Sequence, residues 1–191
     1  MSAELTREGW LALAVEALRP VFAEIKVDLP ASVAVSCGFP GGAPIRKTLG
    51  QCWKTAAAND GRSHLFVTPI ICDSETVLGV LVHELIHAVD DCQSGHKGAF
   101  AKMARALGLE GKLTATRVGA ELAVKLAEII DAIGPYPHAG LSLEAKPTKT
   151  QGTRMLKVEC PSCGYIVRTT AKWLELGTPT CVCGEQMEAA A

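Results

Sequence analysis

The sequence has no excess of charge of either sign and no long apolar run near its start. Lysine and arginine number 19 and aspartate and glutamate 20, so the formal net charge is -1. A chain so close to neutral has no overall field that attracts it to nucleic acid, and any such affinity must come from a local patch. The opening MSAELTREGW carries Glu4 and Glu8 before an apolar stretch that Glu16 and Arg19 interrupt, which fits neither a signal peptide nor a membrane span. We therefore expect a cytoplasmic protein without membrane contact.

The chain also lacks an internal repeat and a disordered composition. Hydrophobic residues make up 48% of its 191 residues and charged residues 20%, which is too apolar for a disordered chain. This length leaves room for one compact domain and a small annex. A core able to hold a buried site is therefore expected.

Hydrophobic periodicity predicts helices combined with a small sheet. Residues 5–25 repeat apolar side chains at helical spacing, with Pro20 placed to kink the helix. Three short runs rich in valine, leucine and aromatic residues, separated by glycine, proline and Asn-Asp-Gly, are expected to be strands: 32–40, 46–53 and 64–70. Three further helices are expected from periodicity and from capping and closing residues: 74–91, 96–109 and 120–133. An α+β fold follows.

The helix expected over 74–91 carries the pattern HELIH. His83 and His87 lie one turn apart on the same face of such a helix, so both imidazoles can reach one ion. Glu84 lies beside them, placed to act as a base on water instead of binding the metal. Four apolar residues mark the buried side of the helix: Leu78, Val82, Leu85 and Val89. A polar trio in so apolar a helix is costly unless something satisfies it, and a zinc ion would.

Because HExxH also arises by chance, a metal site requires a third ligand. A catalytic zinc takes three protein ligands and leaves one position open for water. His96 follows a short loop that contains Ser94 and Gly95, at a longer spacing than the metzincin motif uses. Downstream carboxylates are the alternatives to His96: Glu110, Glu121 and Glu128. His96 is the preferred ligand, and zinc is preferred to manganese or iron.

The 8 cysteines fall into a scattered group and a clustered group. The clustered residues form one CxxC pair and one CxC pair: Cys160, Cys163, Cys181 and Cys183. In a reducing compartment such thiols are better read as metal ligands than as disulfides, and four of them complete a closed, structural zinc site. The CxC spacing replaces the usual CxxC, which leaves open whether both of its thiols bind one ion with ordinary geometry. The scattered residues are expected to be small buried side chains: Cys37, Cys52, Cys72 and Cys92.

Basic residues gather in the segment 146–172: Lys146, Lys149, Arg154, Lys157, Arg168 and Lys172. Glu159 is the one opposing charge in this range, and Tyr165 and Trp173 lie near. A basic surface with aromatic side chains can follow a phosphate backbone and stack on unpaired bases. The alternative is a solvated linker followed by a module whose Tyr165 and Trp173 form its core.

The stretch HELIHAVDDCQSGHKGAF, together with the cysteine-rich tail, resembles the SprT-like metalloprotease family, to which the Spartan-type proteases of DNA–protein crosslinks belong. Members show HExxH, a variable gap, a Gly-His pair and an aromatic residue shortly after it, here Gly95, His96 and Phe100. The resemblance covers most of the chain. It is closest to bacterial and phage-encoded members, whose GFP and IGxCW-like segments are similar to residues 38–40 and 49–53.

The resemblance implies an α+β, minimal zincin-like metalloprotease domain over 1–143, a linker over 144–153 and a zinc-ribbon module over 154–191. It implies that His83, His87 and His96 bind a catalytic zinc and that Glu84 is the general base of peptide hydrolysis. The substrates would be DNA-associated proteins, with DNA contact through the segment 146–172. The rival interpretation is a non-catalytic zinc-binding adaptor in DNA or transcription metabolism, and metal-dependent hydrolysis of a non-peptide substrate is a third.

Several neighbouring polar groups have two interpretations each. Tyr136 and His138 are candidates to stabilise the oxyanion of the tetrahedral intermediate, as are backbone amides of an edge strand, but the sequence GPYPH also reads as a rigid turn. Asp90 and Asp91 could orient the histidines or simply form the solvated end of a helix. These alternatives depend on tertiary structure.

Overall fold

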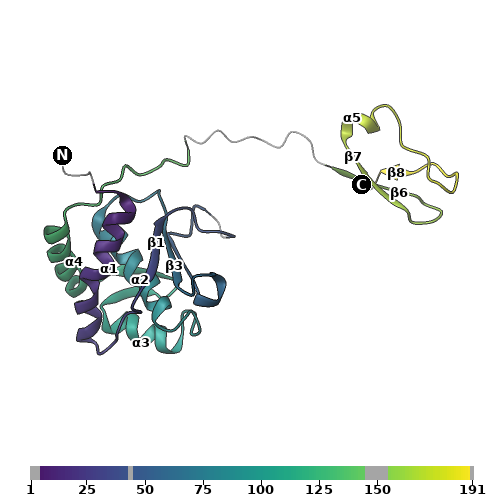
Figure 1. Ribbon diagram of the computed structural model, residues 1–191. Coiled ribbons are helices and arrows are strands. Elements are labelled where there is room, and N and C mark those ends of the chain that lie inside the picture. Colours follow the sequence, from purple (N-terminus) through teal and green to yellow (C-terminus); the bar gives the residue numbers. More distant parts are fainter. Residues whose placement is uncertain (1–4, 43–44, 145–154, 190–191) are drawn as a thin grey trace. The chain divides into compact units, whose positions relative to one another are not determined.

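The computed structural model describes residues 5–42, 45–144 and 155–189 and divides into two compact units, Met1–Ala145 and Lys146–Ala191 (Figure 1). Except for Glu144, the linker predicted over 144–153 lies outside the described residues. None of the helices in the described ranges combines the length and the apolar character that crossing a membrane requires. Both units are mixtures of helices and small sheets, in agreement with the expected α+β class.

The first unit begins with helix α1 (Arg7–Glu24). The hydroxyl of Thr6 accepts a hydrogen bond from the Gly9 amide at 3.1 Å, which satisfies one of the free amides of the first turn. Trp10, Leu18 and Phe22 lie on one face and are fully buried. This apolar face covers the sheet and a second helix, so packing explains why the periodic pattern folds as a helix.

A strand lies in each of the first two expected segments, and a third begins one residue before the third segment and ends within it. The strands β1 (Val33–Cys37), β2 (Gly50–Trp53) and β3 (Ser63–Val67) form a sheet of order β1-β3-β2. The central strand β3 pairs parallel with β1 and antiparallel with β2. A short 3-10 helix, η1 (Thr55–Ala57), follows β2. The strand β2 is therefore an edge, with one side free of sheet partners among the described strands.

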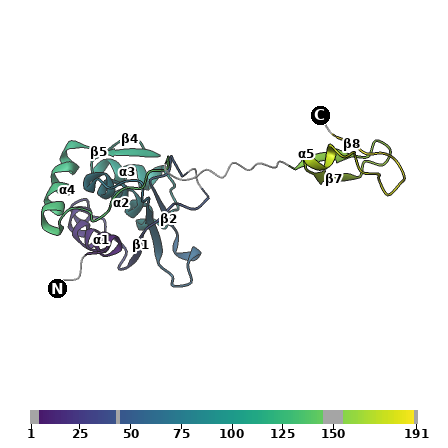
Figure 2. The same ribbon diagram turned by 90° about the horizontal axis from the view of Figure 1, so that it is seen from above.

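Helix α2 (Ser74–Val89) is the centre of the first unit (Figure 2). It starts at Asp73, whose carboxylate accepts a hydrogen bond from the Thr76 amide at 2.8 Å. Apolar side chains on most of its circumference are fully buried, among them Leu78, Leu81, Leu85 and Ile86. The helix packs against β2 and β3 on one side and against β5 and α4 on the other. Any polar group on α2 is thus held in a well-packed frame.

Helix α3 (Gly98–Ala106), strands β4 (Leu109–Lys112) and β5 (Ala115–Val118), and helix α4 (Ala120–Ile133) complete the first unit. The helix expected over 96–109 is shorter at both ends, because His96 and Lys97 precede it and Leu109 already belongs to a strand. Gly108 has φ +88, a conformation that favours glycine and ends the helix before the antiparallel β4–β5 hairpin. The sequence interpretation missed this hairpin.

The second unit is a small sheet with one turn of helix. The strands β6 (Leu156–Glu159), β7 (Ile166–Thr169) and β8 (Glu188–Ala189) have the order β7-β6-β8, and α5 (Ala171–Leu174) follows β7. Its buried hydrophobic cluster consists of four side chains: Val158, Cys160, Cys181 and Met187. A core this small stabilises little, so the unit requires another source of stability.

Candidate metal centres

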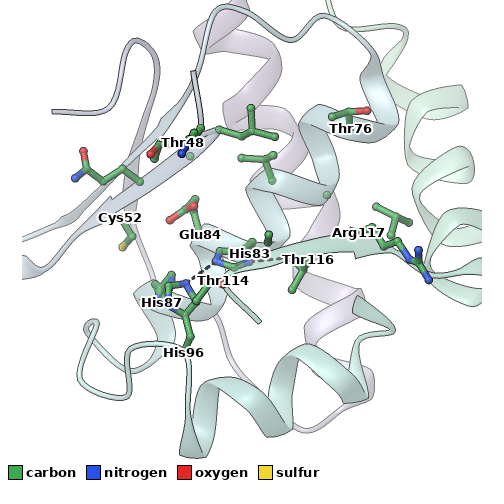
Figure 3. Close-up of a pocket in the computed structure, with 18 of the residues that line it drawn as sticks. Thr48, Cys52, Thr76, His83, Glu84, His87, His96, Thr114, Thr116 and Arg117 are labelled. Atoms are coloured by element: carbon green, nitrogen blue, oxygen red, sulfur yellow. Dashed lines mark hydrogen bonds between the residues drawn. The ribbon is translucent and has the colours of Figure 1, made fainter. Parts of the chain in front are cut away.

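Three histidine side chains converge at the C-terminal half of α2 (Figure 3). The Nε2 atom of His96 lies 3.1 Å from Nε2 of His83 and 3.2 Å from Nε2 of His87. Nitrogens at about 2.0–2.1 Å around a tetrahedral zinc lie about 3.3 Å apart, so these separations fit a common ion. The sequence-predicted ligands His83, His87 and His96 thus form one group that could hold a metal.

The loop between the helices brings His96 back to α2. Asp91, Cys92 and Gly95 all have positive φ, and the Cys92 amide donates to the His87 carbonyl at 2.8 Å. The Asp90 carboxylate accepts from the Ser94 amide at 3.0 Å. The Asp91 carboxylate accepts from the Thr55 amide at 2.7 Å. Both aspartates therefore hold the loop, and neither makes a hydrogen bond to a histidine among the described residues.

Phe100 forms the floor beneath the three imidazoles. Its side chain is fully buried, and its ring stacks on His87 with the two centroids 4.4 Å apart. The rings of His83 and His96 lie edge-on to it, at 4.9 Å and 5.1 Å. The aromatic residue four positions after His96 thus limits the rotation of all three imidazoles.

Thr116 is a partner of the site that the sequence interpretation missed. Its Oγ1 lies 2.9 Å from Nδ1 of His83, on strand β5 of the unexpected hairpin. When Nδ1 donates its proton to this hydroxyl, the Nε2 lone pair of His83 is free to face the other two histidines. Alternating β-branched residues were the available signal: Thr114, Thr116 and Val118.

Burial shifts the titration of the acid and of the histidines in opposite directions. Glu84 is 6% exposed, and burial raises the pKa of its carboxyl to about 8, with a smaller contribution from the Cys92 thiol. Burial, followed by the neighbouring imidazoles, lowers the pKa of His83 to about 3, and burial lowers that of His87 to about 4. The histidines are therefore neutral at pH 7, the form that binds metals.

The Glu84 side chain lies against β2, where Gly50 leaves room for it. A Cβ atom at Gly50 would lie 2.6 Å from Oε1 of Glu84 and 2.6 Å from Cγ1 of Val80. No real Cβ tolerates such distances, so the absence of a side chain at Gly50 is needed for this position of Glu84. Figure 3 shows Glu84 between the strand and His83.

A pocket of about 730 Å³ contains the histidine group and Glu84. Residues 47–52 form one wall, β5 with Thr114 forms the other, and α2 lies between them. The alternative ligands Glu110, Glu121 and Glu128 do not line it. Among the described residues, the pocket is lined only by the two walls, by α2 and by the 92–96 loop.

Tyr136 and His138 do not line this pocket either. The Tyr136 ring packs edge-on against Trp10 at a centroid distance of 5.0 Å, and its amide donates to the Ser74 hydroxyl at 2.9 Å. His138 Nε2 lies 2.8 Å from the Pro69 carbonyl oxygen. The GPYPH segment is thus a packed turn, and Tyr136 and His138 do not line the groove beside Glu84.

The second unit brings four thiols together. The sulfur atoms of Cys160 and Cys183 lie 3.5 Å apart, as do those of Cys163 and Cys181, and all four lie within 4.8 Å of one another. Sulfurs at about 2.3 Å around a tetrahedral zinc lie about 3.8 Å apart. Both members of the CxC pair therefore join one group that could hold a metal. Amides of the CxxC turn, led by that of Cys163, lower the pKa of Cys160 to about 7 and favour its thiolate.

The aromatic residues of the second unit lie at its surface. Tyr165 is 51% and Trp173 57% exposed, so the interpretation of both as core residues is wrong. Lys172 Nζ lies 5.3 Å from the centre of the Trp173 ring, and Lys157 is ion-paired with Glu159. The other basic residues of the segment 146–172 are Arg168, which is described, and three that lie outside the described residues: Lys146, Lys149 and Arg154.

The scattered cysteines are less buried than expected. Cys72 is exposed, and Cys37, Cys52 and Cys92 are half-buried. Cys52 and Cys92 line the pocket of the histidine group. The interpretation as small buried side chains is therefore wrong for Cys72. For Cys52 and Cys92 it omits their position at the pocket.

Comparison of the chain with protein-family models, with curated proteins and with solved structures gave no match. The case for a function therefore depends on the geometry of the two groups of side chains that could each hold a metal.

Proposed function

We propose that this protein is a zinc metallopeptidase of the SprT-like type, with a minimal zincin-like domain and a C-terminal zinc ribbon, and that it cleaves DNA-associated proteins. One observation carries the proposal: three neutral imidazoles converge beside a buried carboxylate in a groove that an edge strand borders. The alternative ligands Glu110, Glu121 and Glu128 do not line this groove. The arrangement suits metal-assisted hydrolysis.

Two zinc ions fit the two groups of ligands. His83, His87 and His96 would hold the catalytic ion, and the four thiolates of the second unit would hold a structural ion. A zinc ion held by these three histidines would supply a Lewis acid for a carbonyl oxygen and would lower the pKa of water toward neutral pH. Four sulfur ligands leave no open position, so the second centre contributes folding energy instead of catalysis.

Glu84 is the general base of the proposed reaction. Its carboxylate takes a proton from the attacking water and then delivers it to the nitrogen of the leaving amine. A bound cation nearby favours the ionised form, so the raised pKa of Glu84 falls when the centre is loaded. The packing of Gly50, Val80 and Glu84 keeps the carboxylate in one place during both transfers.

The edge strand β2 supports a peptide as the substrate. Residues 50–52 of β2 line the groove, and β3 pairs with the other side of the strand. Free backbone groups of an edge strand pair with an extended peptide and hold its carbonyls at a fixed depth. A small ester or amide would use little of this strand, which favours peptide hydrolysis over the non-peptide alternative.

The surface of the second unit supports the association with DNA. Exposed aromatic rings beside cationic side chains bind unpaired bases by stacking, with little sequence preference. Trp173 with Lys172, and Tyr165, offer such surfaces. The described part of the second unit carries few positive charges. We therefore expect its affinity for DNA to come mainly from stacking and to change little with salt concentration.

Cleavage of a purified DNA-binding protein, with and without single-stranded DNA, tests the proposal. Wild type should cleave it, DNA should accelerate cleavage, and Glu84→Gln should abolish cleavage while retaining both zinc ions. Glu121→Gln, an exposed carboxylate of α4 outside the groove, is the matched control and should cleave normally. Retained binding of DNA or protein without cleavage by any variant would favour the adaptor.

A further inference from the structure

We propose that Cys52 and Cys92 form a redox-active dithiol site at the groove, which a low-molecular-weight disulfide converts to an intramolecular disulfide. The inference is independent of peptide hydrolysis, and only its effect on cleavage rests on the proposed function.

The two cysteines come from elements far apart in sequence. Cys52 belongs to the edge strand β2, and Cys92 belongs to the loop between His87 and His96. The Cys92 sulfur lies 3.7 Å from the Cys52 carbonyl oxygen, which places the two residues in direct contact. Both residues line the groove beside the histidine group, so a small reagent can reach them.

Two anchors hold Cys92 against the end of β2. The carboxylate of Asp91 accepts hydrogen bonds from both the amide and the hydroxyl of Thr55, at 2.7 Å and 3.1 Å. The Cys92 amide donates to the His87 carbonyl. Cys92 has φ 61, a conformation that costs free energy for any residue except glycine, so the surrounding bonds impose its position. A disulfide forms readily only between cysteines that are already close together. The anchored loop keeps Cys92 close to Cys52.

The other half of the scattered group has no such arrangement. Cys37 and Cys72 do not line the groove, and Cys72 lies exposed ahead of α2. The remaining cysteines belong to the metal group of the second unit. Cys52 and Cys92 are therefore the one pair of thiols that the groove presents in the described part of the chain.

The oxidation proceeds by two exchanges. One thiolate of the pair attacks a sulfur of the small disulfide, which forms a mixed disulfide and releases one small thiolate. The second thiol loses its proton and attacks the protein sulfur of that mixed disulfide, which forms the Cys52–Cys92 bond and releases the second small thiolate. Two protein thiols are oxidised, one disulfide is reduced, and the two protons end on the two released thiols.

The new bond would tie the edge strand to the loop that carries His96. The strand must adjust when an extended peptide pairs with it, and a covalent link to a loop anchored at Thr55 opposes this movement. The oxidised protein should therefore cleave peptides more slowly, and a reductant should restore the rate. A transient disulfide of this kind is compatible with a reducing compartment.

Treatment of the zinc-loaded, full-length protein with glutathione disulfide, followed by peptide mapping by mass spectrometry, tests the site. A cross-link between the tryptic peptides 48–54 and 63–97 is expected in the folded protein. Because the second peptide also contains Cys72, Cys72→Ser and Cys92→Ser are compared. The cross-link should persist in Cys72→Ser and disappear in Cys92→Ser, with reductant reversing it in wild type.

The cross-link and the cleavage rate are read separately. In wild type the loss of cleavage should follow the cross-linked fraction, while Cys92→Ser should keep its own rate after the same treatment. A folded protein that stays reduced, or that links Cys52 to Cys72, would overturn the site. An inactive protein that still forms the cross-link would contradict the proposed peptidase and leave the dithiol site standing.

Discussion

His83 of helix α2 and Thr116 of strand β5 are joined at one wall of the groove, with Nδ1 of the imidazole 2.9 Å from the hydroxyl oxygen. The contact links the central helix α2 to strand β5 and leaves Nε2 of His83 facing His96. A partner of this kind raises the basicity of a metal-binding histidine and restricts its rotation.

Thr116→Val removes the hydroxyl and keeps the shape of the side chain. We expect the affinity of the histidine centre for zinc to fall by about 10–100-fold, measured by competition with a chelator. Thr116→Ser, which keeps the hydroxyl, should remain close to wild type. Equal affinities of the valine variant and wild type would show that Thr116 does not position His83.

Gly50→Ala places a methyl group where the Glu84 carboxylate now lies. Because β2 and α2 are both packed on this contact, we expect a loss of about 1–3 kcal/mol in the free energy of unfolding, together with a larger loss of peptide cleavage. Gly41→Ala is the control, because its Cβ would meet Trp53 at an ordinary 3.6 Å. Normal stability and cleavage in Gly50→Ala would contradict the described position of Glu84.

The metal-free protein should show a pH dependence that belongs to Glu84. Its pKa is about 8 in the folded state and 4.5 ordinarily, so the folded state holds its proton more tightly. The contribution of Glu84 to the free energy of unfolding is therefore complete below about pH 4.5, where the carboxyl is protonated in both states. It is lost as the pH rises through about 8. The histidines titrate in the opposite sense, because their lowered pKa values remove stability as the pH falls.

Glu84→Gln isolates this contribution because glutamine does not titrate while the histidines remain. The variant should gain stability relative to metal-free wild type as the pH rises from 4.5 to 9, by on the order of 5 kcal/mol at the upper end. Denaturant unfolding at several pH values measures the difference. A stability difference that does not change with pH would contradict the raised pKa of Glu84.

The second unit should depend on its metal for folding. The fully buried part of its hydrophobic cluster contains two non-cysteine side chains, Val158 and Met187, so we expect a metal bound by the four thiolates to supply much of its stability. Cys160→Ser should leave residues 155–189 sensitive to limited proteolysis and the first unit resistant. Resistance of both units after loss of the metal would mean that the small sheet is stable alone.

The sequence was sufficient to predict which side chains come together where their grouping depends on local spacing. His83, Glu84 and His87 follow from helical geometry, and the clustered cysteines follow from their short separations in the chain. His96 was reached by the demand of zinc for a third ligand. These inferences needed no knowledge of which elements pack together.

Features that depend on contacts between distant segments could not be read from the sequence. The β4–β5 hairpin is short, and its role appears only because it packs on α2 and brings Thr116 to His83. The room that Gly50 leaves for Glu84, and the meeting of Cys52 with Cys92, likewise arise from the packing of β2 against α2 and its loop. Exposure of Trp173 was equally undetermined, because an aromatic residue in a small module fits both a core and a surface.

The most direct test of the account is the zinc content per chain of wild type and His96→Ala, determined by elemental mass spectrometry after dialysis. We predict two zinc ions per chain in wild type and one in His96→Ala. The ion that remains in His96→Ala should be lost when Cys160 is also replaced. A wild-type protein with one zinc ion, retained when His96 is removed, would contradict the histidine centre and with it the proposed peptidase.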